Sequence, residues 1–303
     1  MVYQTTIYES SPILEGVNVF NGRKSYVQFH PTKEDSGLVF RVQNSEIPAS
    51  IDNAFLYKSP RSLWMSHSIG VRDKKNQALC IEHLLADVYA TGIDNLVIEL
   101  SDGVGTRFDY DKNHVVIGLM ELKSSTKEKR KTFRVKKDLS KAETTIQDKN
   151  RGDKLSVESS DGFFIDYTAE FPHLSIGKQH YKFEVSDENY VKEIIKARPI
   201  FFMPPIPEGI LRRLIQPFCG VSDRNALLIG SKYEPYFRNT EHPAGIYGKE
   251  EFVRHKIMDV LGTIALLGMN FVETTFKFEK TGHNFDINAL RELKNREIFE
   301  RID

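Results

Sequence analysis

Three short segments of the chain hold side chains that could act together on a substrate, and the first is a histidine–aspartate pair. His255 and Asp259 are four residues apart, so on a helix they project from one face about one turn apart. An imidazole and a carboxylate are ligands that suit zinc. On spacing alone, however, a hydrogen bond between the two side chains on a helix surface is the simpler interpretation.

The other two segments add a glutamate and two histidines. Glu82 and His83 lie inside the apolar sequence CIEHLLA, where both side chains need partners because burying an unpaired charge is costly. His283 ends the sequence KTGH, in which the preceding glycine allows the backbone to approach a ligand closely. We therefore consider the three segments together as a candidate site.

Two helices and one strand are predicted to position these side chains. Residues 250–267 form the clearest helix, because apolar residues recur there at helical spacing. Residues 78–89 show the same spacing, and Gly92 is well placed to end that helix. Residues 274–278 have the alternation of a strand and lead into KTGH.

The rest of the chain follows a similar order in its two halves, with strands first and a long helix late. Predicted strands span residues 25–29, 37–42, 95–100, 163–171 and 181–185. Further helices are predicted over residues 115–123 and 188–197, the second capped by Asp187. Residues 200–218 are apolar but interrupted by prolines, so we expect an irregular loop followed by a short helix from about Glu208. This pattern agrees with an α+β fold.

The length and a change in composition predict two domains. The chain has 303 residues, about twice the length of a typical single domain. Residues 124–154 are mostly polar and charged, so we place the boundary near Lys127, between a domain of residues 1–126 and one of residues 127–303. The basic cluster at 127–131 could bind a polyanion, but a solvated linker or strand edge is the favoured interpretation.

Charge and cysteine content exclude several classes of protein. Lys and Arg total 42, as do Asp and Glu, so net charge gives no reason to expect nucleic acid or an anionic membrane as a partner. Two cysteines, Cys80 and Cys219, cannot form a disulfide framework and are expected to be reduced thiols. The N-terminus lacks the pattern of a signal peptide, and no apolar stretch is long enough to span a bilayer. A cytoplasmic location is expected.

Long segments of the chain resemble one enzyme family. Residues 79–97, 163–198, 249–268 and 280–293, with the motifs EHLLA and EFVRHKIMD, are similar to the zinc-dependent UDP-3-O-acyl-N-acetylglucosamine deacetylases, which catalyse the committed step of lipid A synthesis. The likeness runs in order over nearly the whole chain. It implies two similar α+β domains, each a layered sandwich of sheet and helices, with the active site between them.

The resemblance also implies roles for single residues. His83, His255 and Asp259 would be the zinc ligands, with a fourth position left open as in catalytic zinc sites. Glu82 would be the general base that activates water, and His283 would protonate the leaving amine or stabilise the oxyanion. Two lysines, Lys256 and Lys280, would face the substrate phosphate or the developing negative charge.

The apolar segment at 200–218 falls where the family shelters the acyl chain of its substrate. The residues that could line such a passage are Ile200, Phe201, Phe202, Met203, Ile206 and Leu211. Ordinary core packing is an equally good explanation for these side chains.

Several positions depart from the family pattern. Thr263 stands where the family helix usually carries an aspartate that orients the acid–base histidine. Pro199 and Ile200 replace a threonine and a phenylalanine, Phe20 replaces a histidine, and residues 102–112 replace a differently built turn. Because the predicted metal ligands and Glu82 are retained while the substrate surroundings differ, we expect zinc-dependent amide hydrolysis to be kept.

Three hypotheses for function follow. The leading one is a zinc N-deacetylase that acts on a UDP-linked, 3-O-acylated N-acetylglucosamine, a small-molecule partner. The second is a related zinc hydrolase with a different amide substrate, which the changes around Pro199 and Phe20 would favour. The third is a zinc-retaining binding protein or pseudoenzyme, which is supported by Thr263 alone.

Overall fold

The computed structural model describes residues 2–58, 67–108, 113–174, 176–202, 225–229 and 248–303. These residues form a mixed α+β fold, as expected from the sequence. Its helices are α1 (Glu82–Ala90), α2 (Asn113–Leu122), the short α3 (Asp187–Asn189) with the π-helical turn η1 (Tyr190–Ile194), α5 (Glu251–Ala265) and α6 (His283–Asn295). Within the described ranges, no helix is long and apolar enough to cross a membrane.

The first half of the chain builds a six-stranded sheet in the order β10-β2-β3-β9-β4-β5. Its strands are β2 (Leu14–Asn18), β3 (Lys24–His30), β4 (Leu38–Val42), β5 (Ser45–Pro48), β9 (Leu96–Leu100) and β10 (Thr106–Arg107). Only β4 and β9 run parallel among these pairs. Every second residue of β3 is buried, including Val27 and Phe29, so one face of the sheet packs on the core.

The second half builds a five-stranded sheet in the order β13-β14-β20-β15-β16. Its strands are β13 (Thr145–Asp148), β14 (Asp153–Ser159), β15 (Phe163–Glu170), β16 (Lys178–Glu184) and β20 (Thr274–Glu279). Here β15 and β20 form the parallel pair. Phe163, Ile165, Tyr167 and Ala169 alternate inward along β15, so this sheet also presents one apolar face.

Both sheets are built on the same topology. When the strands of each sheet are taken in chain order, the fifth strand, β9 or β20, lies between the second and the third and pairs in parallel with the third. A helix precedes that strand (α1 or α5) and another follows it (α2 or α6). The similar order predicted for the two halves is therefore confirmed. The boundary at 126/127 stays a prediction and lies within the strand β11 (Lys123–Lys129).

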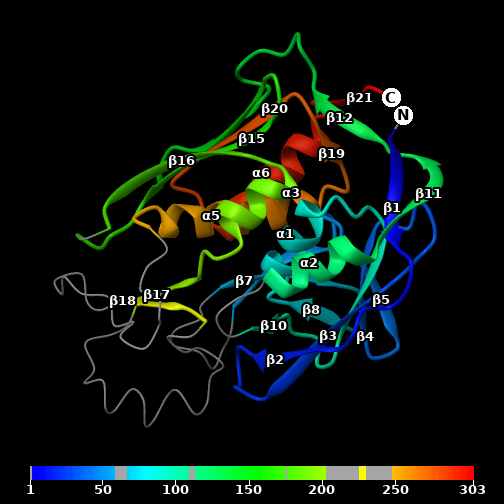
Figure 1. Ribbon diagram of the computed structural model, residues 1–303. Coiled ribbons are helices and arrows are strands. Elements are labelled where there is room, and N and C mark those ends of the chain that lie inside the picture. The colour runs from blue at the N-terminus through cyan, green and yellow to red at the C-terminus, as the bar shows by residue number, and fades with distance from the viewer. Residues whose placement is uncertain (1, 59–66, 109–112, 175, 203–224, 230–247) are drawn as a thin grey trace.

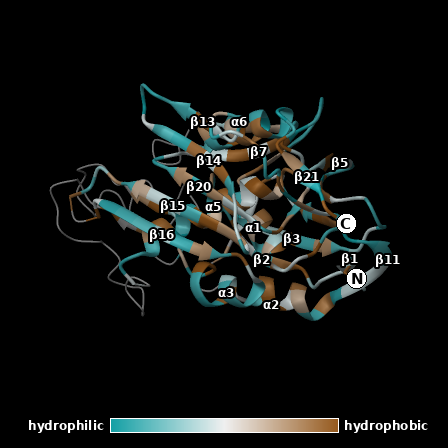
Figure 2. Cartoon of the chain, turned by 90° about the horizontal axis from the view of Figure 1, so that it is seen from above, coloured by the Kyte–Doolittle hydropathy of each residue, from teal (hydrophilic) through white to brown (hydrophobic). Residues whose placement is uncertain are grey.

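The helices lie between the two sheets, as Figure 1 shows. Helix α5 is buried on nearly all sides, with Val253, Ile257, Val260 and Ile264 wholly enclosed, which is the pattern of a central core helix. Seen from above in Figure 2, brown hydrophobic segments gather toward α1 and α5, whereas the hairpin of β13 and β14 ends in teal.

Smaller sheets join the segments around this core. These are β1 (Tyr3–Ile7) with β11 (Lys123–Lys129), β6 (Ala54–Tyr57) with β7 (Ser68–Arg72) and β8 (Gln77–Leu79), β12 (Thr132–Val135) with β19 (Asn270–Phe271) and β21 (Phe299–Arg301), and β17 (Ile200–Phe202) with β18 (Leu227–Ile229). The basic segment at 127–131 continues β11, and Arg130 and Lys131 pair with Asp94 and Asp35. Its interpretation as a strand edge rather than a polyanion site fits these contacts.

Some predicted elements differ from the structure. The helix expected from residue 78 begins only at Glu82, because residues 77–79 belong to β8 and Cys80 has a positive φ of 56°. It ends before Gly92, as expected. The helix expected over 188–197 is only α3 and η1, and Ser186, not Asp187, caps it by accepting the Asn189 N–H. Residues 200–202 form the strand β17 rather than a loop, and the helix expected from Glu208 lies outside the described residues.

Candidate metal centre

The site is formed where α1 of the first half packs against α5 of the second. Gly262 makes this close approach possible, because a Cβ built at position 262 would lie 1.9 Å from the Glu82 carbonyl oxygen. The N-terminal turn of α1, which carries Glu82 and His83, therefore rests directly on the backbone of α5. That helix carries His255 and Asp259 nearer its N-terminus than Gly262.

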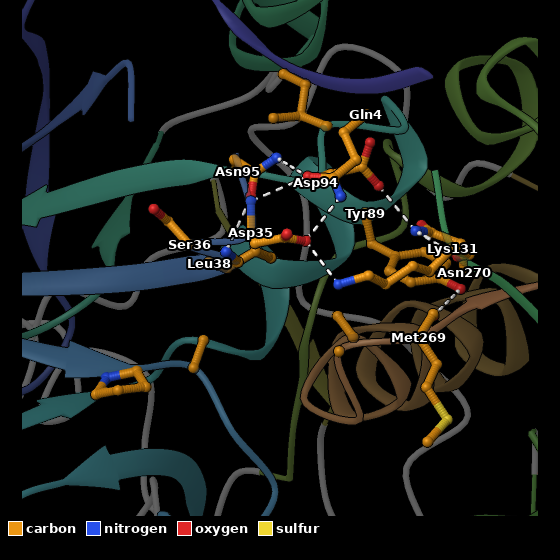
Figure 3. A pocket seen from close by; sticks show the side chains of 16 residues that line it. Gln4, Asp35, Ser36, Leu38, Tyr89, Asp94, Asn95, Lys131, Met269 and Asn270 are labelled. Carbon is orange, nitrogen blue, oxygen red and sulfur yellow. Dashed lines mark hydrogen bonds and ion pairs between the residues drawn. The ribbon is translucent and has the colours of Figure 1, made fainter. Parts of the chain in front are cut away.

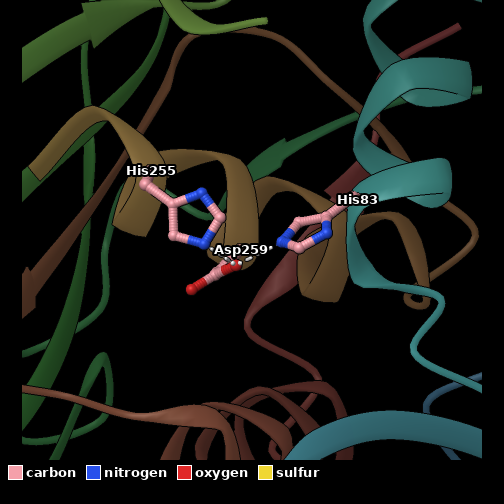
Figure 4. A group of neighbouring side chains, drawn as sticks. All are labelled: His83, His255 and Asp259. Atoms are coloured by element: carbon pink, nitrogen blue, oxygen red, sulfur yellow. Dashed lines mark hydrogen bonds and ion pairs between the residues drawn. The ribbon is translucent and has the colours of Figure 1, made fainter. Parts of the chain in front are cut away.

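Figure 4 shows the side chains of His83, His255 and Asp259 pointing toward one another from these two helices. His83 Nε2 lies 3.2 Å from Asp259 Oδ1, and His255 Nε2 lies 3.4 Å from the same oxygen. The candidate ligand atoms of the three residues all lie within 4.8 Å of one another. The structure thus brings together two residues from one helix and one that precedes Asp259 by 176 positions.

These distances and donors fit a tetrahedral metal ion. Bonds of 2.0–2.2 Å to zinc separate neighbouring ligand atoms by about 3.3–3.6 Å, close to the two separations above. His255 Nδ1 lies 3.2 Å from the Ala197 carbonyl oxygen, a partner that fixes the ring and leaves Nε2 for a metal. The three side chains are 11%, 6% and 5% exposed, so a bound ion would be largely shielded from bulk water.

A buried ion pair holds the Ala197 carbonyl in place. Arg198 donates from Nε to Glu251 Oε1 at 2.8 Å and from Nη2 to Oε2 at 3.1 Å, and its backbone N–H donates to Oε1 at 3.1 Å. Glu251 is wholly buried in the first turn of α5. Because this two-pronged contact ties residue 198 to the helix that carries His255, it sets the position of the neighbouring carbonyl.

Positive charge surrounds the aspartate of the site. Lys256 Nζ lies 3.3 Å from Asp259 Oδ2 and 5.8 Å from the centre of the Tyr167 ring. Although burial alone raises the pKa of Asp259, His255 and Lys256 hold that pKa well below its usual range. Burial likewise lowers the pKa of Lys256, but the acidic groups around it raise the pKa overall, so both groups stay ionised.

Glu82 is buried beside the candidate ligands. The residue is only 3% exposed, and its Oε2 accepts a hydrogen bond from the Ile69 backbone N–H at 3.2 Å. It occupies the first turn of α1, where the helix dipole favours a negative charge. The structure thus holds a buried carboxylate on the residue directly before the candidate ligand His83.

His283 begins α6 and lies within electrostatic reach of the site. Burial lowers the pKa of His283 to about 4, although Asp259 acts in the opposite direction. The imidazole is therefore uncharged at neutral pH in this state. The predicted acid–base histidine is thus placed near the predicted ligands, at the start of a helix that packs against α5.

The predicted substrate residues are less clearly gathered. The Lys280 ammonium pairs with Glu170 at the surface. Phe201 packs into a small cluster with Val19 and Cys80, and Ile200 packs against another formed around Phe252. Met203, Ile206 and Leu211 lie outside the described residues, as does the side chain of Phe202.

Two residues that matter here were missed by the sequence argument. Gly262 is one, because nothing in a single sequence distinguishes a glycine at a helix crossing from any other. Asp286 is the other: it is wholly buried in the first turn of α6. Its spacing of three from His283 was the available signal. Thr263 donates from Oγ1 to the Asp259 carbonyl oxygen at 2.9 Å, so its hydroxyl is engaged within α5.

A separate cavity of about 250 Å³ contains none of the predicted site residues. Figure 3 shows its polar side chains directed toward one another. Gln4 donates to Asp35, Asn95 donates to Gln4, and Lys131 pairs with Asp35. These polar groups form hydrogen bonds and an ion pair with one another, so the cavity is lined by a polar network that joins neighbouring segments.

Two layered halves with a buried histidine–histidine–aspartate triad at their junction, next to a buried glutamate, define a candidate metal-dependent hydrolase. Residues 4–295 match the family LpxC: UDP-3-O-acyl N-acetylglycosamine deacetylase. The chain therefore belongs to the UDP-3-O-acyl N-acetylglycosamine deacetylase family, which confirms the resemblance found in the sequence.

Individual relatives span the same length. The UDP-3-O-acyl-N-acetylglucosamine deacetylase of a Nitratiruptor species is 31% identical over 98% of this chain and 93% of its own length. The proteins of the same name from Sulfurimonas denitrificans and Brucella ovis are 28% and 29% identical, over 100% and 99% of this chain and 96% and 99% of their own. The likeness therefore includes both halves and every segment of the site.

Proposed function

We propose that this chain is a zinc-dependent deacetylase of the cytoplasm that hydrolyses the acetamide of a UDP-linked, 3-O-acylated N-acetylglucosamine. The observation that carries the proposal is the triad of His83, His255 and Asp259, whose ligand atoms lie within 4.8 Å of one another. The relatives that span the whole chain are named for this activity, and the site residues above fit it.

A zinc ion held by the triad would polarise the amide carbonyl as a Lewis acid and make water more acidic. Glu82 accepts the proton of the attacking water on its buried carboxylate, which the Ile69 backbone N–H holds through Oε2. It then passes that proton to the departing amine nitrogen as the C–N bond breaks, so that acetate and a free amino sugar result.

His283 and Lys256 act on the charge that develops during this reaction. Because His283 is uncharged at neutral pH, its ring N–H donates a hydrogen bond to the oxyanion rather than delivering a proton. Lys256 remains protonated beside Asp259 and stabilises negative charge on the same side of the site.

Substrate contacts beyond the amide require two further roles. Lys280 would exchange its surface partner Glu170 for a phosphate of the nucleotide. Ile200, Phe201, Phe202, Met203 and Leu211 would line the passage for the acyl chain. The clusters in which Ile200 and Phe201 pack supply the apolar walls that such a passage needs.

The test is acetate release by zinc-loaded protein from the UDP-linked, acylated sugar, compared with Glu82→Gln. Loss of the base should lower kcat by about 10²–10⁴-fold while zinc content stays the same. If a panel of other N-acetyl compounds contains a better substrate, the chain is a related hydrolase. Zinc and sugar binding without any turnover would identify a binding protein and refute the proposed activity.

A further inference from the structure

One buried carboxylate near the site has no role in the reaction described above. Asp286 lies in the first turn of α6 and is 0% exposed. In the part of the chain that the structure describes, neither of its oxygens has a partner in full hydrogen-bonding geometry, although the Thr281 hydroxyl lies near enough to lower the pKa of the group. Buried polar groups are nearly always paired because an unmade hydrogen bond is costly, so a carboxylate in this condition calls for a functional explanation.

His283 is in the complementary condition on the same helix. Its Nδ1 atom is enclosed and also has no hydrogen-bond partner among the described residues. Residues three apart on a helix are neighbours on one face. The charges of Lys256 and Asp259 shift the pKa of both side chains, so both lie near these two residues. The Nδ1 atom of His283, a potential donor, and the carboxylate of Asp286, an acceptor, therefore lie on one face of α6 near the triad.

We propose that Asp286 is a positioning residue: its carboxylate accepts a hydrogen bond from His283 Nδ1–H and so directs Nε2 toward the reacting amide. This inference rests on the proposed role of His283. The hydrogen bond forms when substrate fills the site, since catalytic contacts are often long before substrate binds and tighten with it. A carboxylate partner for a working histidine fixes its tautomer and orientation.

The surroundings of Asp286 support this assignment. One turn after Asp259 on α5, the Thr263 hydroxyl donates to the Asp259 carbonyl oxygen, so that hydroxyl is engaged within its own helix. Asp286 also lies at the positive end of α6, where the helix dipole favours the carboxylate. Burial raises the pKa of Asp286 to about 7, although Lys256 and the nearby Thr281 hydroxyl oppose this rise, so the group exchanges protons near neutral pH.

Asp286 could instead serve only as a counter-charge for Lys256, and the two roles predict different mutant cycles. With the positioning role, Asp286→Ala lowers kcat about 10–100-fold with little change in KM. Combined with His283→Ala, it lowers kcat almost no further. Combined with Lys256→Met, it lowers kcat by its full factor. A counter-charge role gives the reverse pattern and would overturn the proposal. Asp286→Asn, which keeps an acceptor oxygen, should recover part of kcat and alter the pH profile.

Stability separates a functional from a structural role. Because neither oxygen of Asp286 has a partner in full hydrogen-bonding geometry among the described residues, Asp286→Asn should leave the melting temperature of the zinc-loaded protein unchanged or raise it. A clear fall in melting temperature with parallel loss of rate would mean that the residue is structural. Asp138→Ala, which removes an exposed carboxylate, is the matched control and should change neither quantity.

An activity-independent measurement keeps the inference testable if the proposed function fails. Imidazole nitrogen NMR of the zinc-loaded protein, with substrate or its deacetylated product added, should show His283 protonated at Nδ1 and strongly hydrogen-bonded, and this signal should disappear in Asp286→Ala. An unchanged His283 signal in that variant refutes the assignment, whether or not the protein turns over the acylated sugar.

Discussion

Gly262→Ala tests the helix crossing that assembles the metal centre. The added Cβ would meet the Glu82 carbonyl oxygen at 1.9 Å and the Glu82 carbonyl carbon at 2.7 Å. An ordinary contact requires at least 3.4 Å, so α1 and α5 must move apart by about 1.5 Å or their axes must rotate. Both contacting atoms belong to the backbone, and no side-chain rotation can relieve the clash.

The expected cost has two parts. Overpacking of this kind destabilises by about 1–3 kcal/mol, which is offset in part by up to ~1 kcal/mol from the better helix propensity of alanine. A net loss of about 2 kcal/mol would lower Tm by roughly 4–8 °C. In addition, a shift of about 1 Å between Glu82 and the ligands on α5 should lower kcat on the order of 100-fold.

Gly118→Ala on α2 is the matched control, since it is the same substitution in a helix and a Cβ there meets nothing within 4 Å. It should leave kcat unchanged and raise Tm slightly. Thermal denaturation, metal content and acetate release would be measured on both variants. If Gly262→Ala retains the Tm and kcat of the native protein, the close crossing does not position Glu82 and the reasoning fails.

Three further predictions concern the metal, its support and pH. His255→Ala should reduce bound zinc to well below one equivalent, measured by metal analysis after dialysis, and retention of a full equivalent would exclude His255 as a ligand. Glu251→Gln removes one charge of a buried pair and should lower the free energy of unfolding by about 3–5 kcal/mol. It should also weaken zinc binding, because the Ala197 carbonyl that holds His255 would lose its support. A change in unfolding free energy under about 1 kcal/mol, measured by denaturant titration, would contradict this. Because the folded protein holds a proton on Asp286 up to about pH 7 while the unfolded chain releases it near its ordinary pKa of 3.8, native stability falls as pH rises between these values. Asp286→Asn should therefore be more stable than the native protein by a margin that grows from about pH 4 to pH 7, and a margin independent of pH would refute this.

Local patterns predicted most of the elements that hold the site. The helix at 250–267 is α5 (Glu251–Ala265), and the strand at 274–278 is β20 (Thr274–Glu279), because apolar spacing and turn residues act over a few positions. The prediction at 78–89 was wrong at its start. A chain that turns sharply at Cys80, with φ of 56°, can pass from strand to helix without any residue that marks the change.

Residue types and local spacing were sufficient to identify the candidate metal ligands and the helix faces that present them. The spacing of His255 and Asp259 is a property of one helix, and the segment around His83 resembles a known family closely enough to suggest its role. Those predictions needed only contacts between residues a few positions apart or likeness to related chains.

That these residues lie close together follows from the packing of distant segments and not from any local pattern. His83 and Asp259 are 176 positions apart, and their 3.2 Å separation depends on how two similar halves dock and on the absence of a side chain at Gly262. The same packing buries Asp286 beside His283. Burial, close approach and shifted pKa values arise from contacts between distant segments, and these contacts are fixed by the packing of the whole core rather than by any local pattern.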